Sequence, residues 1–272
     1  MKRCTIITVS NQKGGTGKTT TAFNLSIALA KNGKKVLVVD MDPQANLSMS
    51  FGIKNPDELE ISMREILIAA CAGSELPPKA SYILHSVDLD IIPSNIHLSD
   101  VETKLRDEVG AENTLKELLN PLRNDYDYII IDTNPYLGIF TNNALAACDE
   151  IIIPVSPQLW SATGLTDLLQ RIFKIKQKLN PNIEIKGILL TMCDERTVLF
   201  REAYAMLQAF CQGSIRIFDT HIPNTVRVGE ANFYSQSVME YDEKSKAAIA
   251  YSALAKEVIE DGRNKREETA TA

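Results

Sequence analysis

The stretch "NQKGGTGKTT", residues 11–20, decides how this chain folds. It nearly fits the phosphate-binding pattern G-x-x-x-x-G-K-[ST], but Gln12 replaces the first glycine and Lys13 adds a cation five residues before Lys18. The preceding "CTIITVS" is a short β-branched run, and the following "KTTTAFNLSIALAKNG" has apolar residues at helical spacing with Gly33 at its end. This order of strand, glycine loop and helix predicts an anion site at a helix N-terminus.

Other apolar runs predict buried parallel strands, because they are continuously apolar instead of alternating. They are "KKVLVVDMD", "YDYIIIDT", "DEIIIPVS", "IEIKGILLTMC" and the shorter "LDIIPSN". Strands that alternate with helices over the whole chain predict an α/β fold, a mostly parallel twisted sheet with helices on both faces. The helical patterns cover residues 62–72, 98–109, 114–122, 141–147, 163–179, 198–211 and 244–259.

Length and composition predict one domain. The chain has 272 residues, of which 44% are hydrophobic and 24% charged, as in ordinary globular proteins. Residues 1–260 contain no repeat and no linker rich in Pro, Gly or Ser, so we expect them to form a single domain, with residues 261–272 as a polar, disordered tail. No run of 18 apolar residues and no signal peptide are present, which favours a cytoplasmic protein without a membrane partner.

Charge and cysteine content exclude further classes. With 29 basic and 35 acidic residues, the formal net charge of −6 argues against a protein covered in positive charge, although a local basic patch stays compatible with it. The five cysteines are scattered and never form C-x-x-C. Neither a disulfide framework nor a zinc or iron–sulfur site is predicted.

The glycine loop has the residues that nucleotide phosphates require. Gly14, Gly15 and Gly17 allow the backbone to approach phosphate oxygens closely, and the following helix directs free N–H groups at the same anion. Lys18 is positioned to hold the β and γ phosphates, and the Thr19 hydroxyl to ligate Mg²⁺.

Carboxylates end two other strands. Asp40 and Asp42 are two residues apart, so both leave an extended segment on one side, and Asp132 follows the run "YIII". Each alone is equally compatible with an ordinary turn. Beside Mg²⁺ and a γ-phosphate they can hold metal-bound water and orient an attacking one. Together with the glycine loop they predict Mg²⁺-dependent nucleoside triphosphate hydrolysis by in-line water attack, without a covalent intermediate.

Six stretches resemble, in order, the ParA-type partition ATPases of the short Soj-like kind, within the ParA/MinD superfamily with its deviant Walker A loop. They are "NQKGGTGKTTTAFNL", "VLVVDMDPQAN", "YDYIIIDTNPYLGIFTNNAL", "LLTMCDERT", "HIPNTVRVGEA" and "YDEKSKAAIAYSALAKEV". The resemblance covers residues 1–260 and implies a single P-loop ATPase domain of SIMIBI-type architecture, with ATP and Mg²⁺ as cofactors.

The same resemblance implies a role for the additional lysine. Lys13 would cross the interface of an ATP-dependent homodimer and contact the nucleotide of the partner. Two facing triphosphates bury strong negative charge, which a cation from each subunit offsets, so that dimerisation becomes conditional on ATP.

Further site residues follow from the matching motifs. The resemblance implies that Asp42 orients the hydrolytic water, while Asp40 and Asp132 support the metal shell. Met192 and Pro223 would pack on the adenine, although a Met in "LLTM" is equally compatible with plain core. The expected catalytic residues are Lys13, Lys18 and Asp42; the expected metal-site residues are Thr19, Asp40 and Asp132; the expected nucleotide contacts are Lys13, Gly14, Gly15, Thr16, Gly17, Lys18, Thr19, Thr20, Met192 and Pro223.

The resemblance also implies partners: double-stranded DNA bound without sequence preference, a ParB-like protein that stimulates hydrolysis, and a nucleoid-associated location. Arg196 and Arg227 match arginines that the family uses on DNA. Arg171, Lys174 and Lys178 fall on one helical face and either extend this patch or are ordinary solvated residues.

Two positions depart from the family pattern. Asn224 in "IPNTVR" stands where an arginine is common, which weakens the DNA assignment. Asn134 in "DTNP" replaces a frequent proline beyond Asp132, in the segment that relays the nucleotide state. Neither change affects the phosphate chemistry.

Two other function classes share this scaffold. A MinD-like positioning ATPase, acting on a membrane or protein cargo, is the alternative; its membrane form needs a C-terminal amphipathic helix, and "EVIEDGRNKREETATA" has no apolar face after Ile259. A small-molecule ligase or synthetase is the metabolic alternative, against which "VRVGEA" and "YDEKSKAAIAY" favour partition. The expected cargo is plasmid or chromosomal DNA.

Overall fold

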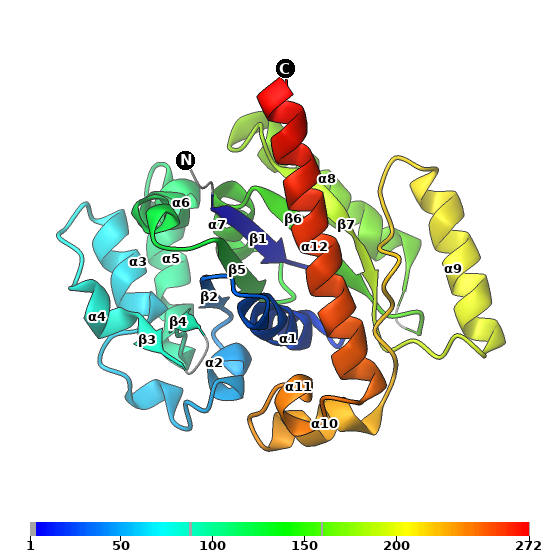
Figure 1. Cartoon of the computed structure of the whole chain (residues 1–272). Coiled ribbons are helices and arrows are strands. Elements are labelled where there is room, and N and C mark those ends of the chain that lie inside the picture. Colours follow the sequence, from blue (N-terminus) through cyan, green and yellow to red (C-terminus); the bar gives the residue numbers. More distant parts are fainter. Residues whose placement is uncertain (1–3, 87–88, 159, 272) are drawn as a thin grey trace.

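The computed structural model describes residues 4–86, 89–158 and 160–271, and its described part is built around a seven-stranded sheet (Figure 1). The strand order is β3-β4-β2-β5-β1-β6-β7, in which β3 pairs antiparallel to β4 and all other pairs are parallel. The predicted α/β class is therefore confirmed. The strands are β1 Thr5–Val9, β2 Val36–Met41, β3 Leu84–His85, β4 Asp90–Ile92, β5 Tyr128–Thr133, β6 Glu150–Val155 and β7 Glu184–Leu190.

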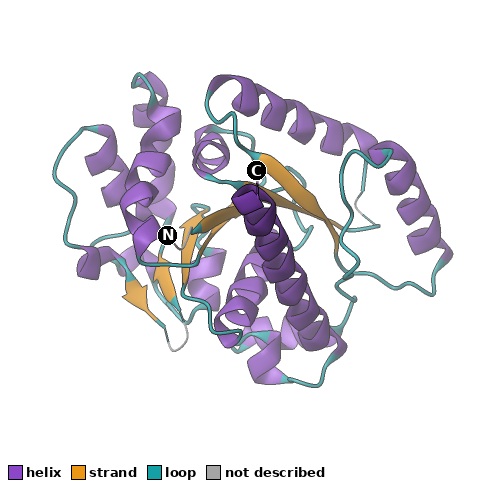
Figure 2. Cartoon of the chain, turned by 45° about the horizontal axis from the view of Figure 1, so that its top comes forward, coloured by secondary structure: helices purple, strands orange, loops and turns teal. Residues whose placement is uncertain are grey.

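Helices cover both faces of the sheet, as Figure 2 shows, and each face has its own apolar core. Successive residues of a strand point to opposite faces, so β5 gives Ile129 and Ile131 to one core and Ile130 to the other. Burial on both faces explains why β2, β5 and β6 are continuously apolar apart from the charged or polar residues at their ends.

The two faces have different helices. On the first lie α3 Met63–Cys71, α4 Lys79–Tyr82, α5 Val101–Asp107, α6 Thr114–Leu119, α7 Ile139–Ala147, α8 Ala162–Lys178 and α9 Val198–Cys211. On the second lie α1 Lys18–Lys31, α2 Asn46–Ser50, α10 Val226–Phe233, α11 Val238–Tyr241 and α12 Lys246–Thr271. Short 3-10 helices span Pro56–Glu58, Ile96–Asp100, Ala111–Asn113 and Asn120–Asn124.

The C-terminal segment differs from the expectation. Residues 261–271, expected to be disordered, continue α12 as far as Thr271, and Ala272 lies outside the described residues. The segment is rich in Lys, Arg and Glu, which have high helix propensity, and it follows the part of α12 that packs against α1 and the core. A polar sequence without an apolar face can therefore extend a helix that has already formed.

Five short elements were missed from the sequence, namely β3, α2, α4, α10 and α11. They have two to eight residues each, too few for a clear periodic pattern. Two of them border the nucleotide site described below.

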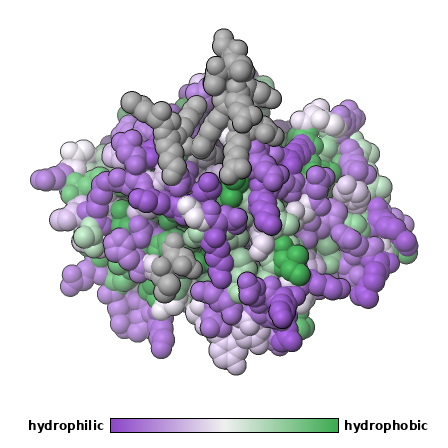
Figure 3. Space-filling view, viewed as in Figure 1, coloured by the Kyte–Doolittle hydropathy of each residue, from purple (hydrophilic) through white to green (hydrophobic). Residues whose placement is uncertain are grey.

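The visible surface is mostly polar. Polar residues cover most of the face in Figure 3, and apolar residues appear there in small groups. No helix in the described ranges is long and apolar enough to span a membrane.

All five cysteines carry free thiols, four of them buried, and burial raises the pKa of Cys148 and Cys193 to about 12.

Candidate nucleotide site

Three sequence motifs meet at one edge of the sheet. Strand β5 lies between β1 and β2, with Asp132 opposite Val9 on one side and opposite Asp40 on the other. The phosphate loop follows β1 directly. All three strands are parallel, so their carboxyl ends bring the loop and both carboxylates together, where open α/β sheets bind ligands.

The phosphate loop has the backbone that its glycines predict. Gly15 and Gly17 have φ of 73° and 79°, in the left-handed region that favours glycine, and α1 begins at Lys18 directly afterwards. The loop is fixed from neighbouring strands, because the Asn11 side chain donates to Pro154 O at 2.7 Å and Thr191 Oγ1 donates to Thr16 O at 2.9 Å. A braced loop with free N–H groups at a helix start suits a phosphate.

Lys18 is a buried cation, with 7% of its surface exposed. Its Nζ donates to Lys13 O at 3.3 Å, across the loop. Burial lowers the pKa of Lys18, and the attraction of Asp132 and Asp42 acts in the opposite direction. An ammonium group held here, with a carbonyl as its hydrogen-bond partner, has donors left for an anionic ligand.

Asp132 is fully buried, and neither of its oxygens has a hydrogen-bond partner within the described part of the chain. Burial raises its pKa well above the usual range, and repulsion from Asp40 adds to this; the nearby Thr19 hydroxyl and Lys18 ammonium oppose the shift. An unpaired buried carboxylate is costly, so its presence beside a phosphate loop indicates a cation ligand.

These residues fit Mg²⁺. In the described ranges, no group of three or more His, Cys, Asp or Glu could hold a metal alone. Mg²⁺ characteristically uses one or two carboxylates together with water and nucleotide phosphates, so a site completed by its nucleotide needs few protein ligands. Thr19 and Asp132 would hold the ion, and Asp40 lies next to Asp132 in the register.

Asp40 and Asp42 have different surroundings. Asp40 is fully buried; it accepts Ser48 N at 2.9 Å, Ser48 Oγ at 2.7 Å and Asp42 N at 3.1 Å. Burial raises the pKa of Asp40 to about 6 despite these bonds. Asp42 accepts only Gln44 N at 3.0 Å in the described part, and burial raises its pKa while Gln44 and Lys18 lower it. Asp40 therefore shapes the turn, whereas Asp42 keeps oxygen lone pairs for a water.

Ser48 was not identified from the sequence. It is fully buried in α2 and joins Asp40 to Ser94, whose N–H donates to Ser48 Oγ at 3.0 Å. The only available signal was a small hydroxyl residue eight positions after Asp40, and no local pattern distinguishes such a serine from a solvated one.

Met192 and Pro223 lie together beside the phosphate loop. The Met192 Cε is 3.7 Å from the position that a Cβ on Gly17 would take. Pro223 forms a β-bridge with Cys193, the residue after Met192. Its two hydrogen bonds run from Cys193 N to Ile222 O and from Asn224 N to Cys193 O, both 2.9 Å. This proximity makes adenine packing possible, while Met192 keeps 36% of its surface exposed.

A cavity of about 370 Å³ opens beside Thr19 and Thr20. Its other walls come from α2 and from the end of α10, two elements that the sequence did not predict. The remaining lining residues are Asn46, Met49, Ser50, Asn232 and Ser235.

Gln12 and Lys13, the two unusual residues of the loop, have different surroundings. Gln12 Nε2 donates to Asp167 Oδ2 on α8 at 3.3 Å, a contact that the usual glycine could not make. Lys13 is exposed, and its side chain forms no hydrogen bond or ion pair with the residues that the structure describes. The loop therefore presents an unpartnered cation to the outside of the site.

The five expected DNA contacts come from three elements. Arg196 precedes α9 and bonds Asp194 at 2.9 and 3.1 Å; Arg227 is the second residue of α10 and contacts Glu230 at 2.9 Å. Ion pairs this exposed are weak, so a phosphate can replace the acid. On α8, Lys174 and Lys178 are exposed, whereas Arg171 is half-buried and donates to Leu137 O at 3.2 Å.

Comparison with known proteins shows which family this chain belongs to. A family model named AAA_31, described as an AAA domain, matches residues 4–185. The sporulation initiation inhibitor protein Soj of Bacillus subtilis is 38% identical over 257 residues, covering 94% of this chain and 99% of Soj. The chromosome partitioning protein ParA of Myxococcus xanthus is 38% identical over 256 residues, covering 93% of this chain and 87% of that protein.

A solved structure is similar over nearly the whole chain. The cobyrinic acid a,c-diamide synthase of Mycobacterium smegmatis, with bound ADP and magnesium, has a TM-score of 0.82 and 31% identity, covering 96% of each chain. Its bound ligands are a nucleotide and magnesium, the two cofactors that the sequence motifs predict for this chain. The chain therefore belongs to the AAA_31 family and is a ParA/MinD-type P-loop ATPase of the partition and positioning class, which hydrolyses ATP with Mg²⁺ as cofactor.

Proposed function

We propose that this ATPase forms an ATP-dependent homodimer, binds double-stranded DNA without sequence preference, and segregates plasmid or chromosomal DNA on the nucleoid. A ParB-like partner stimulates hydrolysis and returns the protein to a monomer. The observation that carries this proposal is Lys13 in the phosphate loop, which is exposed and has no side-chain partner among the described residues. It is a cation that the chain's own site does not use, and a second subunit's triphosphate would offset it.

Each residue of the site then has one task. Mg²⁺, when bound, neutralises charge on the phosphates. Lys18 and the loop N–H groups hold the β and γ phosphates, Thr19 and Asp132 hold the ion, and Asp42 orients the water. Lys13 completes the partner's site across the interface.

DNA binding through a few exposed cations on an acidic protein is weak for one subunit. Doubling the contacts in a dimer raises the avidity, so that DNA release follows from dimer dissociation. Because the contacts are with phosphates, binding falls steeply with salt.

The fold alone does not select this function, since a protein named as a diamide synthase shares it. The near-full coverage of Soj and ParA favours partition. A MinD-like ATPase that positions a membrane or protein cargo is the second candidate; α12 extends to Thr271, but its residues after Ile259 provide no apolar face for a membrane. Liposome sedimentation beside DNA mobility, each with and without ATP, separates the two.

The test uses two variants and a matched control. Lys13→Ala should bind ATP as a monomer and lose the dimer, whereas Asp42→Ala should bind ATP, dimerise and lose at least ~100-fold in turnover. Lys31→Ala, an exposed lysine at the far end of α1, should change neither. Light scattering with a slowly hydrolysed ATP analogue and Mg²⁺ gives the mass, and phosphate release gives the rate. A Lys13→Ala protein that dimerises like the parent would end the proposal.

A further inference from the structure

The segment that leads to Pro223 runs along the outer edge of β7. Ile188 N donates to Arg216 O at 2.8 Å, and Phe218 N donates to Ile188 O at 2.9 Å, which is regular parallel pairing. The next regular bond would join Thr220 N to Leu190 O. Instead, Ile222 N donates to Leu190 O at 2.8 Å, so the segment holds two residues more than the strand beside it.

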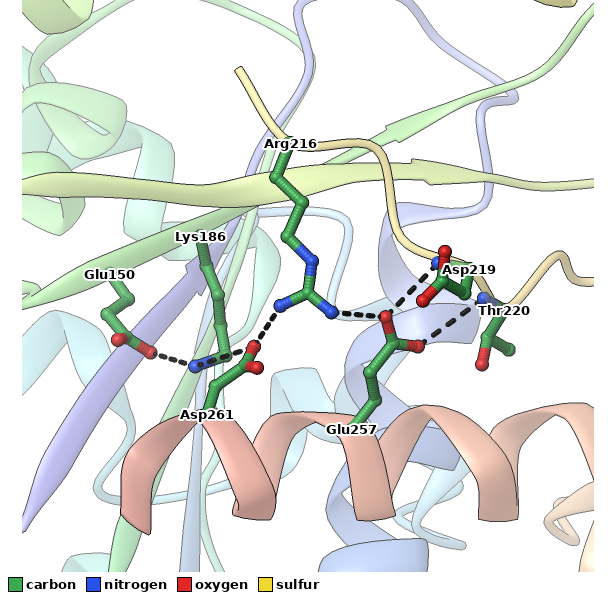
Figure 4. Close-up of polar contacts among 7 residues, drawn as sticks. All are labelled: Glu150, Lys186, Arg216, Asp219, Thr220, Glu257 and Asp261. Atoms are coloured by element: carbon green, nitrogen blue, oxygen red, sulfur yellow. Dashed lines mark hydrogen bonds and ion pairs between the residues drawn. The ribbon is translucent and has the colours of Figure 1, made fainter. Parts of the chain in front are cut away.

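A side chain of α12 holds these extra residues. The Glu257 carboxylate accepts Asp219 N at 3.1 Å and Thr220 N at 3.4 Å, and Thr220 N is the group that the bulge removes from the ladder (Figure 4). Arg216 Nη2 donates to the same carboxylate at 2.5 Å. Glu257 therefore takes the place of the strand as acceptor, from a helix about 40 residues further along the chain.

The neighbouring charges anchor this arrangement. The other arm of Arg216 pairs with Asp261, and the buried Lys186 ammonium lies 2.7 Å from Glu150 and 3.9 Å from Asp261. Figure 4 shows Glu257 and Asp261 side by side on α12, facing Arg216. Only Glu257 of the two carboxylates contacts backbone N–H groups of the segment.

We propose that Glu257 is a positioning residue that sets the register of residues 219–224, and through it the base side of the nucleotide site. A slip of two residues keeps every side chain on its face of the sheet, so alternation of apolar residues does not prevent it. The slipped register would pair Thr220 with Leu190 and bring His221, in place of Pro223, opposite Cys193. The Glu257 bonds exist only in the register with the bulge. The inference rests on Pro223 lining the base, as in the proposed site.

The experiment compares two ligands. Mg²⁺·ADP uses both the phosphate loop and the base side, whereas Mg²⁺·pyrophosphate uses only the loop. Glu257→Gln should weaken ADP binding by about five- to tenfold, because a charged acceptor of backbone N–H groups is lost, and should change pyrophosphate binding by less than about twofold. Calorimetric titration of the purified full chain measures both affinities.

Two variants on the same helix are controls. Asp261→Asn removes charge from the network but no acceptor from the segment, so it should lower the melting temperature and leave the ratio of the two affinities unchanged. Glu260→Gln, an exposed neighbour without a bond among the described side chains, should change neither quantity. Should Glu257→Gln fail to fold, Glu257→Asp, which keeps the charge but shortens the reach, should show the same selective loss.

Equal losses for ADP and pyrophosphate, or an unchanged ADP affinity, would overturn the proposal. Pro223→Ala distinguishes this failure from a wrong base site. If Pro223→Ala weakens ADP binding selectively while the Glu257 variants do not, then Pro223 contributes to the base site, but Glu257 does not set the register. The experiment uses no dimerisation or DNA-binding assay, so its outcome does not depend on the proposed partition function.

Discussion

Two clusters of buried charge lie at opposite ends of the same sheet, and they are built differently. At the carboxyl ends, Asp132 is buried without a hydrogen-bond partner in the described chain, next to Asp40 of the same charge. At the amino ends, Lys186 and Glu150 are 3% and 8% exposed and 2.7 Å apart. At the carboxyl ends, the described part of the chain gives Asp132 a nearby cation, Lys18, but no hydrogen-bonded partner; at the amino ends, the two charges pair directly.

The difference shows what each cluster is for. A buried charge pair contributes little net stability, but removing one partner destabilises the fold strongly because the other charge stays buried. An unpaired one destabilises the free protein and is relieved only by something that binds. Removal of a charge should therefore have opposite effects on stability at the two ends.

The largest effect is expected at the paired end. Lys186→Met leaves the Glu150 carboxylate buried without its lysine, which should lower the free energy of unfolding by about 3–5 kcal/mol. Urea unfolding without nucleotide measures it. The double variant Lys186→Met/Glu150→Gln should recover most of the loss, because no net charge is then buried.

A surface pair provides the matched control for this prediction. Lys79 and Asp125 lie 2.8 Å apart, at 53% and 51% exposure. Lys79→Ala should cost less than about 1 kcal/mol in the same assay. Similar losses for Lys79→Ala and Lys186→Met would contradict the distinction between the two kinds of pair.

The pH dependence at the nucleotide end should be the next largest effect. Burial raises the pKa of Asp40 from 3.8 to about 6, so the folded protein holds this proton more tightly than the unfolded chain does. The stabilisation is fully present below pH 4 and is lost as the pH rises through 6, a change of about 3 kcal/mol. Between pH 4 and 7, the free energy of unfolding of the nucleotide-free protein should fall relative to that of Asp40→Asn. If the unfolding free energies of the two proteins change with pH in parallel, the prediction is wrong.

Asp132→Asn should give the smallest effect on stability, with the sign reversed from that at the paired end. Replacing an unpaired buried carboxylate by an amide should stabilise the nucleotide-free protein by about 1 kcal/mol at neutral pH. The same variant should lose ATP turnover and most of the stabilisation that Mg²⁺·ADP gives the parent. Thermal melts with and without Mg²⁺·ADP test both effects, and a destabilised nucleotide-free variant would show that Asp132 has a structural partner.

Much of the site was predictable because its chemistry is local in sequence. The glycines, Lys18 and Thr19 lie within one loop and one helix turn, and Asp40, Asp42 and Asp132 each end an apolar strand. Contacts made by single side chains over long separations carried no such signal. The hydrogen bond from Ser48 to Asp40 depends on where α2 packs. The hydrogen bond from Gln12 to Asp167, 155 residues away in sequence, depends on where α8 packs.

Local sequence patterns were enough to predict which strands are buried, where the phosphate loop and α1 lie, and which charged residues end the strands, because these depend on periodicity and on backbone freedom at glycine. Three features emerged only in the folded chain: the order that places β5 between β1 and β2, the bulge before Pro223, and the pairing of α12 with Arg216. Strand order and register arise from packing between distant segments, and many orders satisfy the same local pattern.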